Sequence, residues 1–171
     1  IKNLVRRFMP ELFDSEFDQM KRIAGELASN LVERLSRDCQ TTSDTETLTA
    51  QLQQFVRDYS FIQYVYVTDV KGHSTAIAIS DPGDQKGYKA FPIGFDYSNR
   101  EWFQQPMRTG KLHIMNVHQS QVTGQLIITV STVITDANDE IIGVLGADIQ
   151  LEEIIRRAES LEAEEHIGEE E

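Results

Sequence analysis

The chain has 171 residues, of which 40% are hydrophobic and 26% are charged, and this composition indicates a folded domain with a core rather than a disordered segment. Its net charge of −12 argues against nucleic acids and anionic membrane surfaces as partners, because both require clustered lysine and arginine. Cys39 is the only cysteine, which excludes an internal disulfide and a cysteine-based metal site. No run approaches the roughly 18 to 20 apolar residues of a membrane helix. Because the chain begins with Ile1 and not with methionine, we expect an excised fragment, with membrane spans outside it.

The first predicted element is a long helix over residues 10–37. Pro10 suits a first helical turn, and the following residues are rich in Glu, Leu, Met, Ala and Arg. Apolar residues spaced alternately by four and three form one stripe on this helix: Phe13, Phe17, Met20, Ala24, Leu27 and Leu31. Two roles fit such a stripe, packing onto the chain's own sheet and forming the seam of a homodimer.

A polar break separates this helix from a second one. Ser43 and Glu46 have the spacing of a capping box, which predicts a helix that continues to about Tyr59. The composition then changes to aromatic and β-branched residues over 61–70 and 74–80. These two runs, separated by a short turn, predict a β-hairpin.

The second half of the chain predicts a long loop, a short helix and three more strands. The loop at 81–94 exceeds most connections in compact domains, and a helix over 99–109 ends at Gly110. Strands are predicted at 112–119, 125–134 and 141–149, followed by a helix over 151–165 and an acidic tail. The predicted fold class is α+β: a five-stranded antiparallel sheet with the long N-terminal helix on one face. The loop and short helix would cover the other face, where a pocket could form.

An aromatic and charged run at 95–103 provides the first candidate binding residues. Arg100 and Trp102 stand two positions apart, with Phe95, Tyr97 and Phe103 around them. A guanidinium among aromatic faces can hold a carboxylate, and an amine can stack on the same rings. The alternative is that Trp102 and Phe103 fill the core and that Arg100 forms a surface ion pair.

Asp148 is the only charged residue of the last predicted strand. Strand alternation places it on the same face as Ile142, Val144 and Gly146. A half-buried carboxylate is unfavourable unless it is paired. Two partners fit: Arg100 in a structural salt bridge, or the ammonium group of a ligand whose carboxylate meets Arg100.

These motifs resemble the Cache family, which are extracytoplasmic PAS-like sensor modules of bacterial chemoreceptors, histidine kinases and cyclic-di-GMP enzymes. The resemblance covers about 13–155, and its most specific parts are Asp96-x-x-x-Arg100-x-Trp102-Phe103, the Thr123-Gly124 turn and Ile142-Gly-Val-Leu-Gly-Ala-Asp148-Ile. The implied organisation is a long helix at 1–40, a sensor domain at 41–155 and a helix end with an acidic tail at 156–171. It further implies a domain on the periplasmic side of an inner-membrane protein.

The amino-acid-binding members of that family use an Arg-x-Trp-Tyr motif and an aspartate that ends the last strand. By resemblance, Arg100 would hold an α-carboxylate beside Trp102, and Asp148 would hold the α-ammonium. This chain departs from the motif, because Phe103 and Phe95 stand where tyrosines are usual. It also has residues for one PAS-like module, where those members carry two. The ligand class left by this reasoning is a small carboxylate, an amine or an amino acid.

Catalysis is not expected, because the chain lacks a recognisable nucleophile with its base, paired carboxylates or a set of metal ligands. His113 and His118 lie at odd separation in one predicted strand, which places them on opposite faces. We expect no cofactor and no metal. Weaker candidates for ligand contact are Tyr64, Tyr66, Tyr88, Lys89, Thr129 and Ser131. The alternative function is a ligand-free PAS-like module that dimerises and relays signals.

Overall fold

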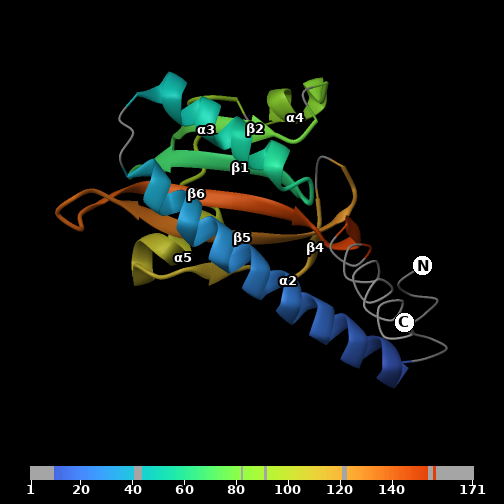
Figure 1. Cartoon of the computed structure of the whole chain (residues 1–171). Coiled ribbons are helices and arrows are strands. Elements are labelled where there is room, and N and C mark those ends of the chain that lie inside the picture. Colours follow the sequence, from blue (N-terminus) through green and yellow to red (C-terminus); the bar gives the residue numbers. More distant parts are fainter. Residues whose placement is uncertain are drawn as a thin grey trace, which may run out of the picture.

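The computed structural model describes residues 10–40, 44–81, 83–90, 92–120, 123–153 and 156. An antiparallel sheet forms the centre of the domain, and helices lie on both of its faces (Figure 1). The helices are α2 (Pro10–Cys39), α3 (Thr45–Asp58), α4 (Gln85–Ala90) and α5 (Glu101–Thr109). The strands are β1 (Ile62–Asp69), β2 (Ser74–Ile79), β3 (His113–Ile114), β4 (His118–Gln119), β5 (Leu126–Thr135) and β6 (Ile141–Gln150).

The strand order is β2-β1-β6-β5-β3, and β4 also pairs with β5. The last strand in sequence, β6, therefore lies in the middle of the sheet between β1 and β5. A central strand is covered on both faces, which explains why Gly143 to Ile149 are all buried. The predicted α+β class, the antiparallel sheet and the β1–β2 hairpin are confirmed.

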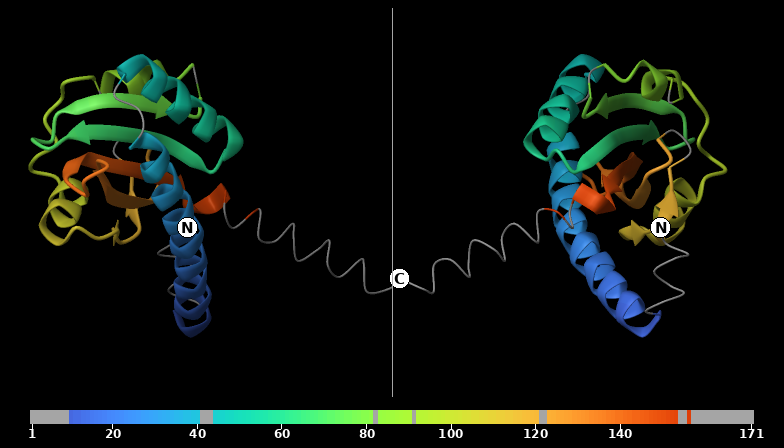
Figure 2. Two further views of the ribbon diagram at one scale, coloured as in Figure 1. Left: turned by 60° about the vertical axis from the view of Figure 1, so that its left-hand side comes forward. Right: turned by 90° about the vertical axis from the view of Figure 1, so that its right-hand side faces the viewer.

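The helices α2 and α3 cover one face of the sheet. Figure 2 shows α2 running across this face and extending beyond the edge of the sheet toward its N-terminal end. The N-cap of α3 is Asp44, whose Oδ2 accepts a hydrogen bond of 2.8 Å from the Thr47 N–H. The prediction of Ser43 as the cap was wrong by one residue, because a carboxylate adjacent to the first turn makes this bond instead.

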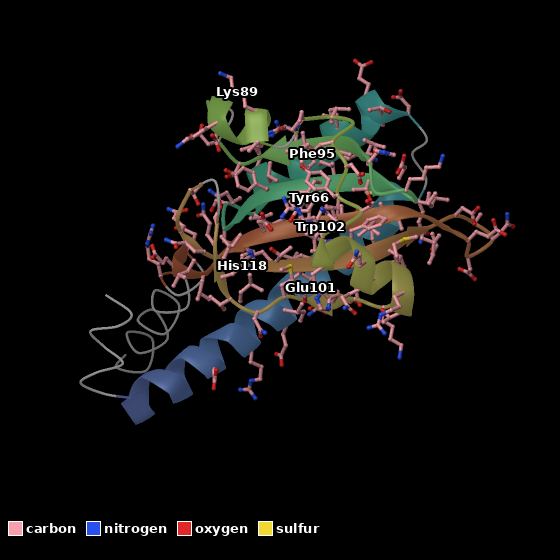
Figure 3. All side chains as sticks on the ribbon, turned by 180° about the vertical axis from the view of Figure 1, so that it is seen from behind. Tyr66, Lys89, Phe95, Glu101, Trp102 and His118 are labelled. Carbon is pink, nitrogen blue, oxygen red and sulfur yellow. The ribbon has the colours of Figure 1, made fainter. Side chains whose placement is uncertain are left out.

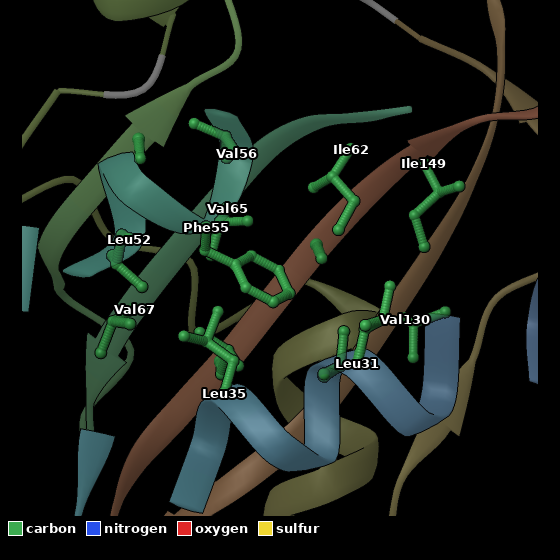
Figure 4. Close-up of a cluster of buried hydrophobic side chains, with 14 of the residues drawn as sticks. Leu31, Leu35, Leu52, Phe55, Val56, Ile62, Val65, Val67, Val130 and Ile149 are labelled. Carbon is green, nitrogen blue, oxygen red and sulfur yellow. The ribbon is translucent and has the colours of Figure 1, made fainter. Parts of the chain in front are cut away.

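An aliphatic core fills the space between these two helices and the sheet (Figure 4). Its side chains come from α2, α3 and alternate positions of the strands, and they include Leu31, Leu35, Leu52, Phe55, Val65, Val67, Val130 and Ile149. Leu31 is the one residue of the predicted apolar stripe whose side chain is described, and it is buried. The stripe residues from Phe13 to Leu27 belong to α2, but their side chains lie outside the described part.

Two regions differ from the predicted elements. The predicted strand at 112–119 is divided into β3 and β4, both paired with β5, with a break at 115–117. The predicted loop at 81–94 contains the short helix α4, which the interior Gly87 had concealed. The predicted last helix is helical at 151–153, and most of its remainder lies outside the described residues.

Among the described residues, no helix combines the length and the apolar character needed to cross a lipid bilayer.

Candidate ligand-binding site

The loop that carries the aromatic run is fixed to the β1–β2 turn by backbone hydrogen bonds. The Tyr97 N–H donates to Gly72 O at 2.8 Å, and the Ser74 N–H donates to Phe95 O at 2.9 Å. Gly72 has φ +91°, and a Cβ there would lie 2.7 Å from the Ser98 backbone nitrogen. Only glycine permits this close approach, so the turn and the loop can lie in direct backbone contact.

The helix α5 begins directly after this loop. Arg100 occupies its N-cap position with an extended backbone, and its side chain makes no capping bond. Gly110 ends the helix in the left-handed conformation with φ +67°, as predicted. The first turn buries Trp102 and Phe103 against the sheet while the Arg100 side chain remains exposed.

A cavity of about 630 Å³ lies between α5, α4, the loop and the sheet face opposite α2. Figure 3 views the molecule from this side and shows Tyr66, Trp102, Phe95 and His118 around it. Five of the six predicted site residues line the cavity: Phe95, Tyr97, Arg100, Trp102 and Asp148. Phe103 does not line it and packs instead in a buried cluster that also contains Tyr64, Ile77 and Val144.

Asp148 forms the floor of the cavity and is only 5% exposed. Its Oδ1 accepts two hydrogen bonds of 2.7 Å, one from the Tyr66 hydroxyl and one from the Thr129 hydroxyl. Both donors come from strands next to β6, because Thr129 is the direct β5 partner of Asp148 and Tyr66 is the β1 partner of Gly146. Since both of these bonds reach Oδ1, Oδ2 is the oxygen left for a group in the cavity.

Burial raises the pKa of Asp148 above its ordinary value. The hydrogen bonds from Thr129 and Tyr66 and the charge of His118 oppose this rise without cancelling it. Burial, and then the charge of Asp148, holds the pKa of Tyr66 well above its ordinary value, so its hydroxyl stays protonated and donates. The floor of the cavity is therefore a carboxylate for which the hydrogen bonds and charges of the protein do not fully offset the cost of burying its ionised form.

The cavity has an aromatic wall above Asp148. The ring centroids of Tyr66 and Trp102 lie 4.6 Å apart, those of Tyr97 and Trp102 lie 5.3 Å apart, and those of Phe95 and Tyr97 lie 4.8 Å apart. Burial raises the pKa of Tyr97 to about 12, and the charge of Arg100 opposes this rise. Such a wall can pack against an apolar group or stack against a cation.

Arg100 and Asp148 do not pair with each other. The ion pairs within the described part of the chain include His113 with Glu101 at 2.9 Å, but none joins Arg100 to Asp148. The two charges lie at different parts of one cavity, with Arg100 exposed and Asp148 buried. The structural salt bridge, one of the two pairings that the sequence allowed for Asp148, is therefore absent from the described part of the chain.

The weaker candidates divide into two groups. Tyr66 and Thr129 line the cavity and bind Asp148. Tyr64, Lys89 and Ser131 do not line it, and the side chain of Tyr88 lies outside the described residues.

Sequence reasoning missed the contribution of the β3–β4 segment. His113 pairs with Ser131 and His118 with Ile127, and these partners share one sheet face, so the prediction that the histidines lie on opposite faces was wrong. The break at 115–117 resets the alternation between the two short strands. His118 lines the cavity together with Met115, Gln119, Ser120 and Ile127, and its Nδ1 donates to Asn116 O at 2.9 Å. Within the described residues, no cluster of side chains has the composition of a metal site.

Residues 45–156 match the model of the methyl-accepting chemotaxis protein-like family, first PDC sensor domain. The chain belongs to this family of sensor domains. The family match agrees with the resemblance to Cache modules that the motifs at Arg100 and Asp148 indicated.

Solved chemoreceptor domains share the fold of this PDC sensor domain. The ligand-binding domain of Campylobacter jejuni Tlp3, solved with 4-methylisoleucine, matches with a TM-score of 0.60 and 17% identity, over 84% of this chain and 62% of that one. The ligand-binding domain of Pseudomonas fluorescens CtaA, solved with L-leucine, matches with a TM-score of 0.59 and 22% identity, over 90% of this chain and 63% of that one.

A relative at higher identity is a much longer protein. Over 156 residues, 91% of this chain, the PDC sensor domain is 38% identical to the Syntrophus aciditrophicus protein named citrate (Re)-synthase. The match spans 25% of that protein.

Proposed function

We propose that this PDC sensor domain binds a small organic ligand whose amine occupies the floor of the cavity. The observation that carries the proposal is Asp148, a buried carboxylate that accepts two hydrogen bonds but has no cation of the protein paired with it in the described part. An isolated ionised carboxylate is strongly unfavourable in a buried site. A ligand ammonium at Oδ2 would supply the missing charge and would recover this free energy on binding.

The other end of the ligand is a carboxylate held by Arg100. The guanidinium lines the cavity, has no capping role in α5 and is free of Asp148. A guanidinium binds a carboxylate with two parallel hydrogen bonds. A molecule with an amine and a carboxylate, such as an amino acid, satisfies both charged groups at once, and the aromatic wall accepts its side chain. The solved neighbours with 4-methylisoleucine and L-leucine support this class.

The domain is the extracytoplasmic sensor of a transmembrane signalling receptor. In this proposal its membrane spans and its output domain lie outside the 171 residues, and it performs no catalysis of its own. The output domain would belong to a chemoreceptor, a histidine kinase or a cyclic-di-GMP enzyme. A homodimer through α2 would place two such sensors side by side.

The position of Asp148 gives a short path from ligand to output. Asp148 lies three residues before Leu151, where β6 passes into helix, and Leu151 is buried in the core next to α2 and α3. A ligand that draws α5 and Asp148 together would act on the C-terminal end of the domain at Leu151 and, through the core around Leu151, on the N-terminal helix α2. A small displacement there would shift a two-state equilibrium in the receptor.

The test is a thermal-shift screen of the domain against amino acids, small carboxylates and small amines, followed by calorimetry of the compounds that raise the midpoint. Ligands that bind only the folded state raise it by mass action. We expect Arg100→Ala to weaken binding by about 1.5 to 3 kcal/mol, the range of a hydrogen bond to a charged group, and Asp148→Asn to weaken binding of amines.

Arg108→Ala is the matched control, because Arg108 is an exposed arginine of the same helix that bonds Gln105 and does not line the cavity. It should bind like the parent. If Arg100→Ala and Arg108→Ala retain the same affinity for every compound, the site is wrong. If no compound shifts the parent, the ligand-free interaction module becomes the better reading.

A further inference from the structure

One wall of the cavity is attached to the sheet through a tyrosine that does not itself line the cavity. Tyr64 lies on β1 and is fully buried, with an exposed fraction of 0%. Its hydroxyl donates a hydrogen bond of 2.8 Å to Asp84 Oδ2. Asp84 stands directly before α4, so this bond connects the start of that helix to the sheet.

The same carboxylate also fixes the first turn of α4. Asp84 Oδ1 accepts a hydrogen bond of 2.7 Å from the Gly87 N–H. A Cβ at Gly87 would lie 2.6 Å from Asp84 Oδ2 and 2.9 Å from the Tyr64 ring carbon Cε1. The glycine therefore provides the space in which the phenol and the carboxylate meet, and the three residues form one contact unit.

This unit lies next to the floor of the ligand site. Tyr64 is the β1 register partner of Asp148, two residues before Tyr66, whose hydroxyl binds Asp148. On the other side of the unit, α4 contributes Lys86 and Ala90 to the cavity lining. The Tyr64–Asp84 bond thus spans from the strand that positions the floor to the helix that forms a wall.

The chemistry of the pair favours a persistent hydrogen bond. Burial, and then the Asp84 carboxylate, raises the pKa of Tyr64 far above its ordinary value, so the phenol remains a donor throughout the neutral range. A phenol donating to a carboxylate makes a stronger bond than two neutral groups make. The six-residue helix α4 is too short to be stable without such an attachment.

We propose that Tyr64 is a positioning residue of the ligand site: through Asp84 it holds α4 against the sheet and keeps the wall formed by Lys86 and Ala90 in place. The importance of this wall for binding rests on the function proposed above. The attachment itself does not depend on any ligand, and it can be tested without one.

The test uses two variants. Tyr64→Phe keeps the buried ring and removes the hydroxyl, and Asp84→Ala removes both hydrogen bonds while leaving every residue of the sheet unchanged. Tyr59→Phe is the matched control, because Tyr59 bonds Arg34 on the opposite side of the sheet. Two readouts report on α4 and the cavity. The first is hydrogen–deuterium exchange of residues 83–90, and the second is acrylamide quenching of Trp102, the single tryptophan, which lines the cavity.

We expect exchange over 83–90 to become about tenfold faster in Tyr64→Phe and faster still in Asp84→Ala, the size of effect that loss of one charge-assisted hydrogen bond produces in local opening. Acrylamide quenching of Trp102 should increase in the same order, and Tyr59→Phe should match the parent in both readouts. Unchanged exchange and quenching in Tyr64→Phe and Asp84→Ala would overturn the proposal, even if both variants melt earlier. A confirmed attachment together with a failed ligand screen would refute only the proposed ligand binding.

Discussion

The two faces of the sheet are built from the same strands and have opposite characters. Toward α2 and α3, alternate strand residues are aliphatic and pack into a continuous core, as at Val65, Val130 and Ile149. Toward α5, the intervening positions carry hydroxyl, aromatic and acidic side chains, as at Tyr66, Thr129 and Asp148. One face fills its volume, and the other encloses a cavity of about 630 Å³.

This difference separates the groups that stabilise the fold from the groups available for binding. The cavity face buries a carboxylate, and it also buries the Ser131 hydroxyl oxygen without a hydrogen-bond partner among the described residues. Buried polar groups in this condition lower stability. Proteins keep such groups where function requires them. The stability should therefore come from the face covered by α2 and α3, called the helix-covered face below, and the binding from the face toward α5.

The largest expected effect is on the helix-covered face. Leu52 of α3 is fully buried in the aliphatic core, and Leu52→Ala should lower the free energy of unfolding by about 2 to 5 kcal/mol, because it removes apolar burial and leaves a void. Urea unfolding followed by circular dichroism measures this loss. Acrylamide quenching of Trp102 under native conditions should stay at the parent level. A loss below about 1 kcal/mol would mean that this core is not the main source of stability.

The helix-covered face is also the part that the sequence predicted well. Runs of aromatic and β-branched residues predicted the β1–β2 hairpin, and the second predicted helix is α3, on which Leu48, Leu52 and Phe55 are buried at helical spacing. The strand face of Asp148 followed from the alternation of side-chain direction along any strand. These features depend on local periodicity, which a single sequence contains.

The cavity was predictable only where a residue type is unusual for its position. Arg100, Trp102 and Asp148 stood out as a charge or an aromatic group in an apolar setting, and all three line the cavity. His118 and Lys86 gave no such signal, because their places depend on the break at 115–117 and on a short helix held by tertiary contacts. Phe103 resembled its neighbours in sequence, but the turn of α5 directs it into the core.

The second prediction concerns the donors that hold Asp148. Thr129→Val keeps the side-chain shape and removes the hydroxyl that donates to Oδ1. At neutral pH this should lower the free energy of unfolding by about 1.5 to 3 kcal/mol, since a hydrogen bond to a charged group is lost. In an Asp148→Asn background the same substitution should lower it by only about 0.5 to 1.5 kcal/mol, because the acceptor is neutral. Equal losses in both backgrounds would mean that Asp148 is not ionised in the folded domain.

The third prediction is a gain of stability from removing the buried charge. Asp148→Asn retains an oxygen that can accept from both Tyr66 and Thr129, and it should raise the free energy of unfolding at neutral pH in the absence of ligand, because a neutral amide is less costly to bury than a carboxylate. A structural salt bridge with Arg100 would produce the opposite sign. Thermal unfolding of the two proteins in ligand-free buffer measures the difference.

The pH dependence of that gain follows from the raised pKa of Asp148. The folded state holds this proton more tightly than the unfolded state, so the parent loses stability as pH rises from about 4, the ordinary aspartate value, through the raised pKa. Asp148→Asn lacks this group, so its advantage should be full above the raised pKa and vanish below about pH 4. An advantage that stays constant from about pH 4 to neutrality would contradict a raised pKa at this position.

The smallest expected effect is the lack of thiol reactivity in the folded protein. Cys39 at the end of α2 is buried in the aliphatic core, and burial, followed by the charge of Asp38, raises its pKa to about 12. At about pH 8 the thiol is neutral and covered, so an aromatic disulfide reagent should react with it only when the domain unfolds. The reaction rate then measures the unfolded population. Leu52→Ala should raise this rate more than tenfold, since each 1.4 kcal/mol of lost stability is a factor of about ten in the unfolded population. Asp148→Asn should lower the rate. Fast reaction in the parent, unaffected by either variant, would show that the core around Cys39 opens locally without global unfolding. The helix-covered face would then not be the tightly packed side of the sheet.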